Sequence, residues 1–350
     1  MFYQCPKCKL KWQHPIERCP NCFIALERIK SSKAKVIGVS RVTISTLLHP
    51  KVPYFALILE DEKGNKWAHK SVKEYKVGEE LHTKSNKDAV AIWRSKYDIL
   101  EAIEKVVELI GGIEVNQKSK IIILPTLVSP AHPFIGENTH PDVLDAVIKF
   151  LIQEGAKPEN IKVAGQSFDE ILFEASAQKS QFAEVCGKNK TVLLDLSKGE
   201  FIQKTVNNFN FEIVADLFKQ DLIINLPTLN LHPKLGVQGA TENLIKLLDK
   251  RSYLALKYLF SGEEIFAKIN QVLPSNILTI GEAMSVQKRN KLTTLLSFIL
   301  AGFDMSKVDR VFAEICLVDQ LPDYLKKIKI ENIPIAGREI KEMQLDVESL

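Results

Sequence analysis

The sequence predicts an α/β protein whose parallel-rich sheet has helices on both faces, preceded by a small metal-bound module and a small β-barrel. Three observations support this prediction. Two Cys-x-x-Cys pairs occupy the first 22 residues, the next segments alternate like short strands, and strand-like and helix-like patterns alternate beyond residue 98. We therefore expect three domains, at residues 1–30, 31–97 and 98–350.

Composition and length are those of an ordinary globular protein. The chain has 350 residues, of which 45% are hydrophobic and 26% are charged, so it can bury a sizeable core. No apolar run approaches the roughly 18 to 20 residues that span a bilayer. The start MFYQCPKC also lacks the basic and then apolar layout of a signal peptide. We expect a cytoplasmic protein without a membrane span.

Charge is distributed unevenly along the chain. Residues 1–97 contain 19 Lys and Arg against 9 Asp and Glu, a net of +10, whereas residues 98–350 contain 28 against 34, a net of −6. A basic amino-terminal third points to an anionic partner such as nucleic acid, a nucleotide or a phosphorylated cofactor. A solvated lysine-rich surface is the alternative interpretation.

The first 22 residues carry the strongest motif. Cys5, Cys8, Cys19 and Cys22 form two Cys-x-x-Cys pairs separated by ten residues, and each pair fits a tight turn that aims two thiolates at one tetrahedral ion. Four protein ligands leave no open position for water or substrate. We therefore expect a structural Zn2+ that supplies most of the folding free energy of a small ribbon. Two further cysteines lie in apolar segments and are predicted to be buried thiols: Cys186 and Cys316.

Short strands follow the ribbon. The segments at 36–46, 54–71 and 77–81 are rich in β-branched and aromatic residues, and residues 61–65 have the composition of a hairpin turn. This part of the chain resembles rubredoxin-like zinc ribbon plus OB-fold proteins of the domain of unknown function 35 type. The resemblance rests on the paired cysteines, the region of Pro15 and Arg18, and the stretch HPKVPYFALILED. We expect a five-stranded OB-like barrel, which the resemblance associates with docking of a partner protein or a CoA-like cofactor.

Aromatic and basic residues on the barrel suggest another function. OB barrels bind single-stranded nucleic acid on faces that combine positive charge with stacking rings. Alternation along the strands predicts that about half of the candidate residues point into the barrel instead. The candidates are Trp67, Tyr54, Phe55, Lys66 and Lys70.

Helix-like and strand-like segments alternate in the rest of the chain. Residues 98–110 have apolar residues at helical spacing and end at Gly111-Gly112. Near-continuous apolar runs separated by helices indicate a parallel sheet covered on both faces, whose ligands bind beyond the carboxyl ends of the strands. The predicted strands are 121–128, 161–165, 191–196 and 221–227, and the predicted helices are 141–154 and 169–178.

Chemistry is expected in the loops that follow these strands. No GxGxxG, Walker P-loop or GxSxG motif occurs, so the common dinucleotide, nucleotide and hydrolase sites are not indicated. Three histidines can converge there as metal ligands or as acid and base: His132, His140 and His232. Alternatively, each of them only caps a helix or turn by a hydrogen bond. Gly236 and Gly239 either present backbone N–H groups to an anion or only let the chain turn.

Three loop segments carry a family resemblance. They are Pro125-Thr126-Leu127 with Thr139-His140-Pro141, the stretch ADLFKQDLIINLPTLNLHPKLGVQGATENL, and AGFDMSKVDRVFAEI. Over residues 98–340 these segments resemble domain of unknown function 362, an uncharacterised α/β family often associated with iron-sulfur proteins. The loop HPKLGVQGA is also similar to the His-Gly loop of lactate racemase-type nickel-pincer enzymes, which implies a shared site position. The implied site has His232, His140 and Asp309 as catalytic residues and Asn225, Gly236, Gly239, Asn243 and Thr139 as cofactor-binding residues.

The chain departs from that family at four positions where members usually have lysine. If those lysines bind an anionic substrate, their loss removes charge-assisted contacts worth about 1.5 to 3 kcal/mol each. Lys234 can restore one charge. The domain has therefore either kept a pocket without its reaction or changed to a neutral or differently charged substrate. The four positions are Leu124, Thr228, Asn230 and Glu242.

Two aspartates of the third segment have different expected roles. Asp304 is predicted to cap the helix that follows it. Asp309 lies within that helix and either faces the pocket or pairs with Lys307 or Arg310.

We therefore expect a zinc-binding protein whose α/β pocket binds a small molecule and whose basic barrel docks a partner protein or a CoA-like cofactor. The first alternative is a metal- or histidine-dependent enzyme that acts on a small carbonyl or carboxylate compound. The second alternative is single-stranded nucleic-acid binding through the barrel.

Overall fold

The computed structural model describes residues 2–13, 16, 18–29, 34–46, 52–71, 74–81, 86–95, 98–166, 173–206, 209–259 and 269–349. The chain forms two compact units, Met1–Lys84 and Ser85–Leu350. The boundary expected near residue 97 lies instead at residue 84, because Val90–Arg94 is a strand of the second unit's sheet. Pro15 and residues 169–172 of a predicted helix lie outside the described residues.

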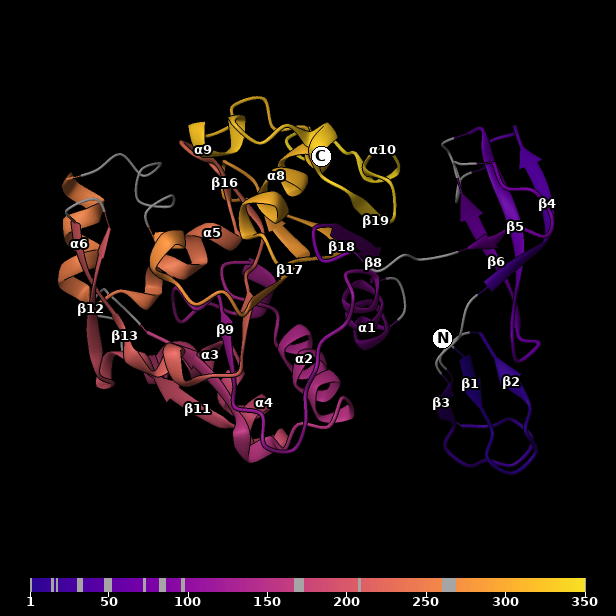
Figure 1. The fold of residues 1–350 in the computed structure, drawn as a ribbon, viewed down its shortest axis with the longest axis horizontal. Helices are drawn as coiled ribbons and strands as arrows, with labels where there is room; N and C mark the ends of the chain where they lie inside the picture. Colours follow the sequence, from indigo (N-terminus) through magenta and orange to yellow (C-terminus); the bar gives the residue numbers. More distant parts are fainter. Residues whose placement is uncertain are drawn as a thin grey trace. The chain divides into compact units, whose positions relative to one another are not determined.

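The first unit contains two small antiparallel sheets, which Figure 1 shows in indigo and purple. The cysteine-rich segment forms a sheet in the order β2-β1-β3, and the next segment forms a sheet in the order β6-β5-β4-β7. The described part of this unit supplies four strands to the second sheet, so the five-stranded OB-like barrel stays a prediction. The strands are β1 (Phe2–Gln4), β2 (Lys11–Trp12), β3 (Glu27–Ile29), β4 (Ala34–Val42), β5 (Tyr54–Asp61), β6 (Lys66–Ser71) and β7 (Glu80–Leu81).

The hairpin predicted at residues 61–65 is confirmed. Oδ1 of Asp61 accepts the backbone N–H groups of Lys63 and Asn65 at 2.9 and 2.8 Å. Gly64 has a φ of 73°, a left-handed conformation that glycine adopts without a steric penalty. The turn sets the register of β5 and β6, with Glu60 opposite Lys66.

The aromatic residues of the first unit divide between its interior and its surface. Phe55 and Trp67 pack against the small buried cluster of this sheet, and the ring of Trp67 meets the ring of Phe2 edge-on at 5.5 Å. Tyr54 has the Nζ atom of Lys70 4.6 Å from its ring centroid. Alternation along β5 and β6 accounts for this division.

The second unit is built on one eight-stranded sheet in the order β11-β10-β9-β14-β17-β18-β8-β19. The strands from β11 to β17 are parallel, β18 runs antiparallel to both of its neighbours, and β19 is parallel to β8. The predicted α/β class is therefore confirmed. The strands are β8 (Val90–Arg94), β9 (Ile121–Pro125), β10 (Ile161–Gly165), β11 (Val192–Asp195), β14 (Leu222–Leu226), β17 (Ile277–Gln287), β18 (Thr293–Gly302) and β19 (Ile335–Gly337).

Helices cover both faces of this sheet (Figure 1). In β9, Ile121 and Ile123 pack into the core that also takes residues of α1, α2 and α4, whereas Ile122 packs into the core that takes residues of α5 and α8. Strands buried on both faces explain the near-continuous apolar runs in the sequence. The helices are α1 (Ile99–Leu109), α2 (Pro141–Gln153), α3 (Phe173–Lys179), α4 (Phe182–Asn189), α5 (Ala240–Asn243), α6 (Lys250–Leu259), α8 (Met305–Ile315), α9 (Asp323–Lys326) and α10 (Ile340–Met343).

Two hairpins and several single turns complete the unit. The hairpin of β15 and β16 connects β14 to α5, and the short helix η5 continues from α5. No helix in the described ranges combines the length and the apolar character needed to cross a bilayer. The remaining elements are β12 (Phe201–Val206), β13 (Phe209–Val214), β15 (Asn230–His232), β16 (Gly236–Gln238), η1 (Pro133–Ile135), η2 (Pro158–Asn160), η3 (Leu196–Lys198), η4 (Ala215–Lys219), η5 (Leu244–Leu247) and η6 (Ile330–Asn332).

The parallel register brings two loops to the same edge of the sheet. Pro125 at the end of β9 lies opposite Leu226 at the end of β14. The loop after β9 and the loop after β14 therefore leave the sheet side by side, next to β17. This edge is where parallel sheets bind their ligands.

Candidate functional site

The first candidate site is the group of four cysteines in the first unit. The sulfur atoms of Cys5, Cys8, Cys19 and Cys22 all lie within 4.8 Å of one another, and those of Cys8 and Cys19 are 3.6 Å apart. Four sulfurs around one tetrahedral zinc ion, with arms of about 2.3 Å, are separated by about 3.8 Å. The donor set therefore fits one metal ion.

Both cysteine pairs have the same backbone conformation. In the first pair, the N–H of Cys8 points at Sγ of Cys5 at 3.4 Å, and the N–H of Lys9 donates to the carbonyl of Cys5 at 3.0 Å. Lys9 has a φ of 59°, which closes the turn. In the second pair the N–H of Phe23 likewise donates to the carbonyl of Cys19, at 2.8 Å, and Phe23 has a φ of 54°. Two equivalent turns that face each other are the geometry that a tetrahedral ion requires.

The pKa values of two of these thiols shift in opposite directions. Burial opposes ionisation of Cys5, but hydrogen bonds from the backbone of Cys8 and Lys7 lower its pKa to about 6. Burial and the neighbouring thiols raise the pKa of Cys22 to about 12. Ionisation of Cys22 is therefore opposed by its surroundings in the protein alone. A bound cation removes this opposition, because metal ligands are deprotonated by the ion itself.

The second candidate site is a cavity of about 80 Å³ at the carboxyl ends of β9 and β14. Three of the four positions at which the sequence lacks an expected lysine lie in its wall: Thr228, Asn230 and Glu242. The fourth, Leu124, borders a smaller apolar hollow next to it. The cavity is lined by Thr126, Val128, Glu137, Thr228, Asn230, Gln238, Gly239, Glu242, Asn243, Lys246, Gln287 and Lys291.

An acid and a base share this cavity. Glu242 in α5 and Lys246 in η5 are four residues apart, so they lie on one face of a continuous helical segment. Burial raises the pKa of Glu242 to about 7, and burial lowers the pKa of Lys246 to about 8. Nε2 of Gln238 donates to Oε1 of Glu242 at 3.2 Å. Both groups are therefore able to exchange protons near neutral pH.

Buried hydrogen bonds fix the wall of the cavity. The hydroxyl of Thr126 donates to Oδ1 of Asn243 at 3.0 Å and accepts the backbone N–H of Thr228 at 3.0 Å. Nδ2 of Asn243 donates to the carbonyl of Leu124 and to Oδ1 of Asn225, both at 2.9 Å. The donor hydrogens of the Thr126 and Asn243 side chains are used in hydrogen bonds within the protein. Toward a ligand these side chains therefore offer mainly oxygen atoms that accept hydrogen bonds.

Glu282 of β17 lies directly behind this wall. Its Oε1 accepts the hydroxyl of Thr228 at 2.8 Å and the backbone N–H of His140 at 3.2 Å, and its Oε2 accepts the N–H of Met284 at 2.8 Å. Burial nevertheless raises its pKa to about 7. Sequence reasoning did not identify Glu282, because a lone glutamate inside an apolar strand carries no recognisable motif.

The three loop histidines act as caps. Each one precedes a proline, and the residue before proline favours the extended conformation that begins a helix or turn. Since proline has no N–H, the first free donor is two residues beyond the histidine. Nδ1 of His132, His140 and His232 accepts the N–H of Phe134, Asp142 and Lys234, at 3.4, 3.3 and 3.2 Å respectively.

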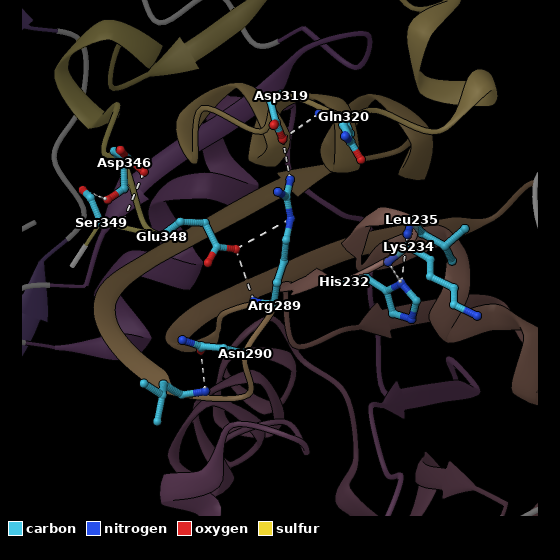
Figure 2. Close-up of polar contacts among 11 residues, drawn as sticks. His232, Lys234, Leu235, Arg289, Asn290, Asp319, Gln320, Asp346, Glu348 and Ser349 are labelled. Carbon is cyan, nitrogen blue, oxygen red and sulfur yellow. Dashed lines mark hydrogen bonds and ion pairs between the residues drawn. The ribbon is translucent and has the colours of Figure 1, made fainter.

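This capping restricts what the histidines can do chemically. A neutral imidazole that accepts at Nδ1 carries its proton on Nε2, and that nitrogen then has no lone pair for a metal. Burial lowers the pKa of His140 and of His232, and the positive charges of Lys291 and Lys234 lower the pKa of His232 further. Figure 2 shows the ring of His232 facing the backbone of Lys234 and Leu235.

Hydrogen bonds to residues that do not line the cavity hold the turn between β17 and β18. Nη2 of Arg289 donates to Oδ1 of Asp319 at 2.6 Å, and its backbone N–H donates to Oε1 of Glu348 at 3.2 Å (Figure 2). The turn continues to Lys291, which has a φ of 68° and lines the cavity. These contacts hold the turn that brings one ammonium group to the cavity wall.

Asp309 stabilises the start of α5. Oδ1 and Oδ2 accept the backbone N–H groups of Ala240 and Thr241 at 2.6 and 2.9 Å. A side chain at Gly239 would collide with Oδ1 of Asp309, so glycine is needed there for this contact. Lys307 and Arg310 do not pair with Asp309; they pair with Asp304 and Glu314.

Other predicted residues also have structural contacts. Gly236 has a φ of 73°, and a side chain there would collide with the carbonyl of Gln320. The hydroxyl of Thr139 donates to the carbonyl of Leu226 at 2.7 Å. Asp304 accepts the N–H groups of Ser306 and Lys307 at 3.0 and 3.1 Å, which confirms the predicted cap of α8.

The structure therefore brings some of the predicted residues to the cavity and separates others from it. Gly239 and Asn243 line it, whereas His140, His232, Asp309, Asn225, Thr139 and Gly236 do not. Sequence reasoning missed five residues with charged or amide groups in the wall: Glu137, Gln238, Lys246, Gln287 and Lys291. The spacing of Glu242 and Lys246 directly after the glycine-containing loop was the available signal.

The fold and the cavity define an α/β protein with a small polar pocket at the carboxyl ends of parallel strands. Residues 121–314 match the model of a family described as a domain of unknown function (DUF362). The match spans more than half of the 350 residues, so the chain belongs to this family. No curated protein matches the chain.

One solved structure with a similar chain path is the lactate racemase apoprotein from Thermoanaerobacterium thermosaccharolyticum. The likeness covers 75% of this chain and 62% of that chain, at 13% sequence identity and a TM-score of 0.41. This chain therefore covers less than two thirds of the length of that protein.

Proposed function

We propose that the α/β unit binds a small polar molecule in the cavity at the ends of β9 and β14. The observation that carries this proposal is the presence of both Glu242 and Lys246 in the wall of an open cavity of about 80 Å³. Pockets for drug-sized ligands are several times larger. The expected ligand is therefore a short molecule with a few polar groups.

The wall favours a ligand with hydrogen-bond donors. The hydroxyl hydrogens of Thr126 and Thr228 are used by Asn243 and Glu282, so toward a ligand these hydroxyl oxygens can act only as acceptors. Glu137 adds a carboxylate, which also accepts the hydroxyl of Ser129 at 2.6 Å. Hydroxyl or amino groups of a ligand match such a surface.

Charges in the wall argue against a polyanionic ligand. Two carboxylates and two ammonium groups line the cavity, so their formal charges cancel: Glu137, Glu242, Lys246 and Lys291. The presence of Thr228, Asn230 and Glu242 instead of the expected lysines also lowers the positive charge of the wall. This balance supports a neutral or singly charged ligand rather than a phosphate-rich one.

Two exposed valines allow a matched test of this proposal. Val128 lies at the cavity and is 40% exposed, whereas Val192 on the edge strand β11 is 43% exposed and distant from it. A panel of small polyols, hydroxycarbonyl compounds and amino acids is screened by thermal shift and calorimetry. We expect at least one compound to bind wild type and Val192→Phe saturably but not Val128→Phe. Absence of any binding, or equal binding to both variants, contradicts the proposal.

We further propose that the four cysteines hold one structural Zn2+. The chemistry of four thiolates within 4.8 Å supports this assignment, since zinc is the usual metal of closed four-cysteine sites. The ion would supply charge neutralisation and folding free energy rather than reactivity. In the described residues, no other group of three or more metal-binding side chains meets.

The first unit is proposed to dock an anionic partner, either a protein or a CoA-like cofactor. Its excess of positive charge supports this role, and Lys70 places one such charge over the ring of Tyr54. Single-stranded nucleic acid is the competing occupant. Retention on a single-stranded oligonucleotide with a steep salt dependence would favour nucleic acid, whereas saturable binding of CoA alone would favour the cofactor.

An enzymatic role is the second candidate function. The caps formed by His140 and His232 do not support a histidine- or metal-dependent reaction. Glu242 and Lys246 support acid and base chemistry instead, since burial moves the pKa of each toward neutrality. The carbonyl or carboxylate class of substrate remains compatible with this pair.

A further inference from the structure

We propose that Lys246 is a nucleophilic amine that forms an imine with a short hydroxyaldehyde or hydroxyketone held in the cavity, and that Glu242 is the acid and base of this step. The inference rests on the proposed binding function of the same cavity. It names the substrate class and the residue that bonds to it.

Lys246 is held in a position that suits a nucleophile. Its Nζ atom donates to the carbonyl of Leu127 at 3.2 Å, and Nε2 of Gln166 donates to the backbone carbonyls of Lys246 and Leu248. The side chain is therefore fixed at both ends. One N–H group on the carbonyl of Leu127 leaves the lone pair of a neutral amine free to attack.

Apolar surroundings keep part of this amine uncharged. Lys246 borders the polar cavity and also the small hollow behind it, whose walls include Leu124, Leu127 and Leu247. Burial among such side chains disfavours the ammonium form, which is why the pKa of Lys246 falls to about 8. A solvated lysine with a pKa near 10.4 is almost fully charged at neutral pH.

Glu242 stands one helical turn before the amine. Nε2 of Gln238 orients its carboxyl group, and burial together with the charge of Asp309 raises its pKa to about 7. At neutral pH this group is present both as an acid and as a base. Imine formation needs both forms, first to protonate a leaving oxygen and later to take a proton back.

Other residues in the wall select the rest of the substrate. The oxygen atoms of Thr126 and Thr228 and the carboxylate of Glu137 accept hydrogen bonds. A hydroxyl group next to the carbonyl would donate to them while the carbonyl carbon faces Lys246. Simple alkyl aldehydes would leave these acceptors without partners and bind more weakly.

The step balances as follows. The neutral amine of Lys246 adds its lone pair to the carbonyl carbon, and the proton lost from nitrogen goes to the oxygen. The protonated carboxyl of Glu242 then gives its proton to the hydroxyl of this carbinolamine, and the C–O bond breaks to release water. The products are a protonated imine and the carboxylate of Glu242, which stabilises the new positive charge. No oxidant or further reactant is consumed.

Reductive trapping tests this inference on the full-length protein. Wild-type protein is incubated with glycolaldehyde or dihydroxyacetone and sodium cyanoborohydride, and the modified lysines are located by peptide mass spectrometry. We expect saturable alkylation of Lys246 at least about tenfold faster than any surface lysine, with a rate that is highest between about pH 7 and 8, where Glu242 is still partly protonated and Lys246 is partly neutral. Within one sample, the surface lysines are the internal control.

Variants separate the roles of the two residues. Lys246→Arg should abolish the fast modification, Glu242→Gln should slow it about tenfold or more, and Lys188→Arg on the exposed surface of α4 should leave it unchanged. Modification of Lys246 at the rate of surface lysines overturns the inference. If the compound still binds wild type and Val192→Phe but not Val128→Phe, the proposed binding function stands without the imine. If it binds none of them, this substrate class is wrong.

Discussion

Asp309 accepts the backbone N–H of Ala240 at 2.6 Å across 69 residues of sequence. This contact joins α8 to the first turn of α5, the helix that carries Glu242 into the cavity wall. Asp309 is fully buried and does not line the cavity, so it is a positioning residue. The position of the acid in the cavity therefore depends on a carboxylate that does not line it.

Replacement of Asp309 should destabilise the protein. Asp309→Asn keeps one acceptor but turns an amide N–H₂ toward one of the two backbone N–H groups. We expect the free energy of unfolding to fall by about 1–3 kcal/mol, and by more for Asp309→Ala, because buried donors lose their partners. Urea denaturation measures the change, and the exposed Asp88→Asn is the control. Unchanged stability together with lost ligand binding would instead indicate direct contact with the ligand.

Removal of the metal should unfold only the cysteine-rich sheet. Cys19→Ser takes away one of four ligands, so we expect the zinc content to fall from about one ion per chain to none. The unit Ser85–Leu350 has its own cores, so its thermal transition should remain. Elemental analysis and calorimetry measure both effects. Cys186→Ser should retain the metal, and equal zinc loss in that variant would contradict the assignment.

Stability should fall as the pH rises toward neutrality, partly because of Glu282. Burial raises its pKa from 4.5 to about 7 in the folded protein. Between these values the folded state binds more protons than the unfolded state, so the free energy of unfolding decreases with pH and levels off above about 7. The contribution of this residue is on the order of 3 kcal/mol.

Glu282→Gln isolates this contribution. A glutamine does not titrate, so the variant should show a shallower loss of stability between about pH 4.5 and 7, whatever its absolute stability. Urea unfolding at several pH values gives the slope, and the exposed Glu159→Gln should keep the wild-type slope. If the free energy of unfolding has the same pH dependence in wild type and Glu282→Gln, the proton that the folded state binds in this range is on another group.

The loop histidines should be replaceable by asparagine. Asparagine is a good N-cap residue, and its side-chain oxygen can accept the same backbone N–H as Nδ1 of His140 or His232. We expect His140→Ala to lose about 1 kcal/mol of stability and His140→Asn to recover most of it. The same comparison applies to His232. A metal-binding or acid-base role predicts the opposite result, with ligand binding or turnover lost in both substitutions.

Much of the fold could be predicted because its signals are local. The helix predicted at residues 98–110 is α1, and Gly111 follows it with a φ of 109°, as the glycine pair in the sequence indicated. The hydrophobic runs of β9 and β14 required a parallel sheet because both of their faces are buried. The long strands β17 and β18 were missed, since apolar runs of this length fit a helix as readily as a strand.

The site was harder to predict because its residues acquire their properties from burial. Lys246 and Glu282 are ordinary in sequence, and only the fold removes them from water. The histidines were conspicuous in sequence, yet the proline after each one already favoured a cap. The cysteines were predictable because the spacing of each pair alone determines its turn.

The hydrogen-bond network of Thr126, Thr228, Asn225 and Asn243 links the wall of the cavity to three neighbouring strands. A substitution in this network would change ligand preference and lower the stability of the fold at the same time. Most such variants would therefore be lost during evolution before a new ligand preference could be selected. New specificity should therefore arise first at wall positions outside the network, and Glu137, Gln238 and Lys291 are the positions where divergence among relatives is expected.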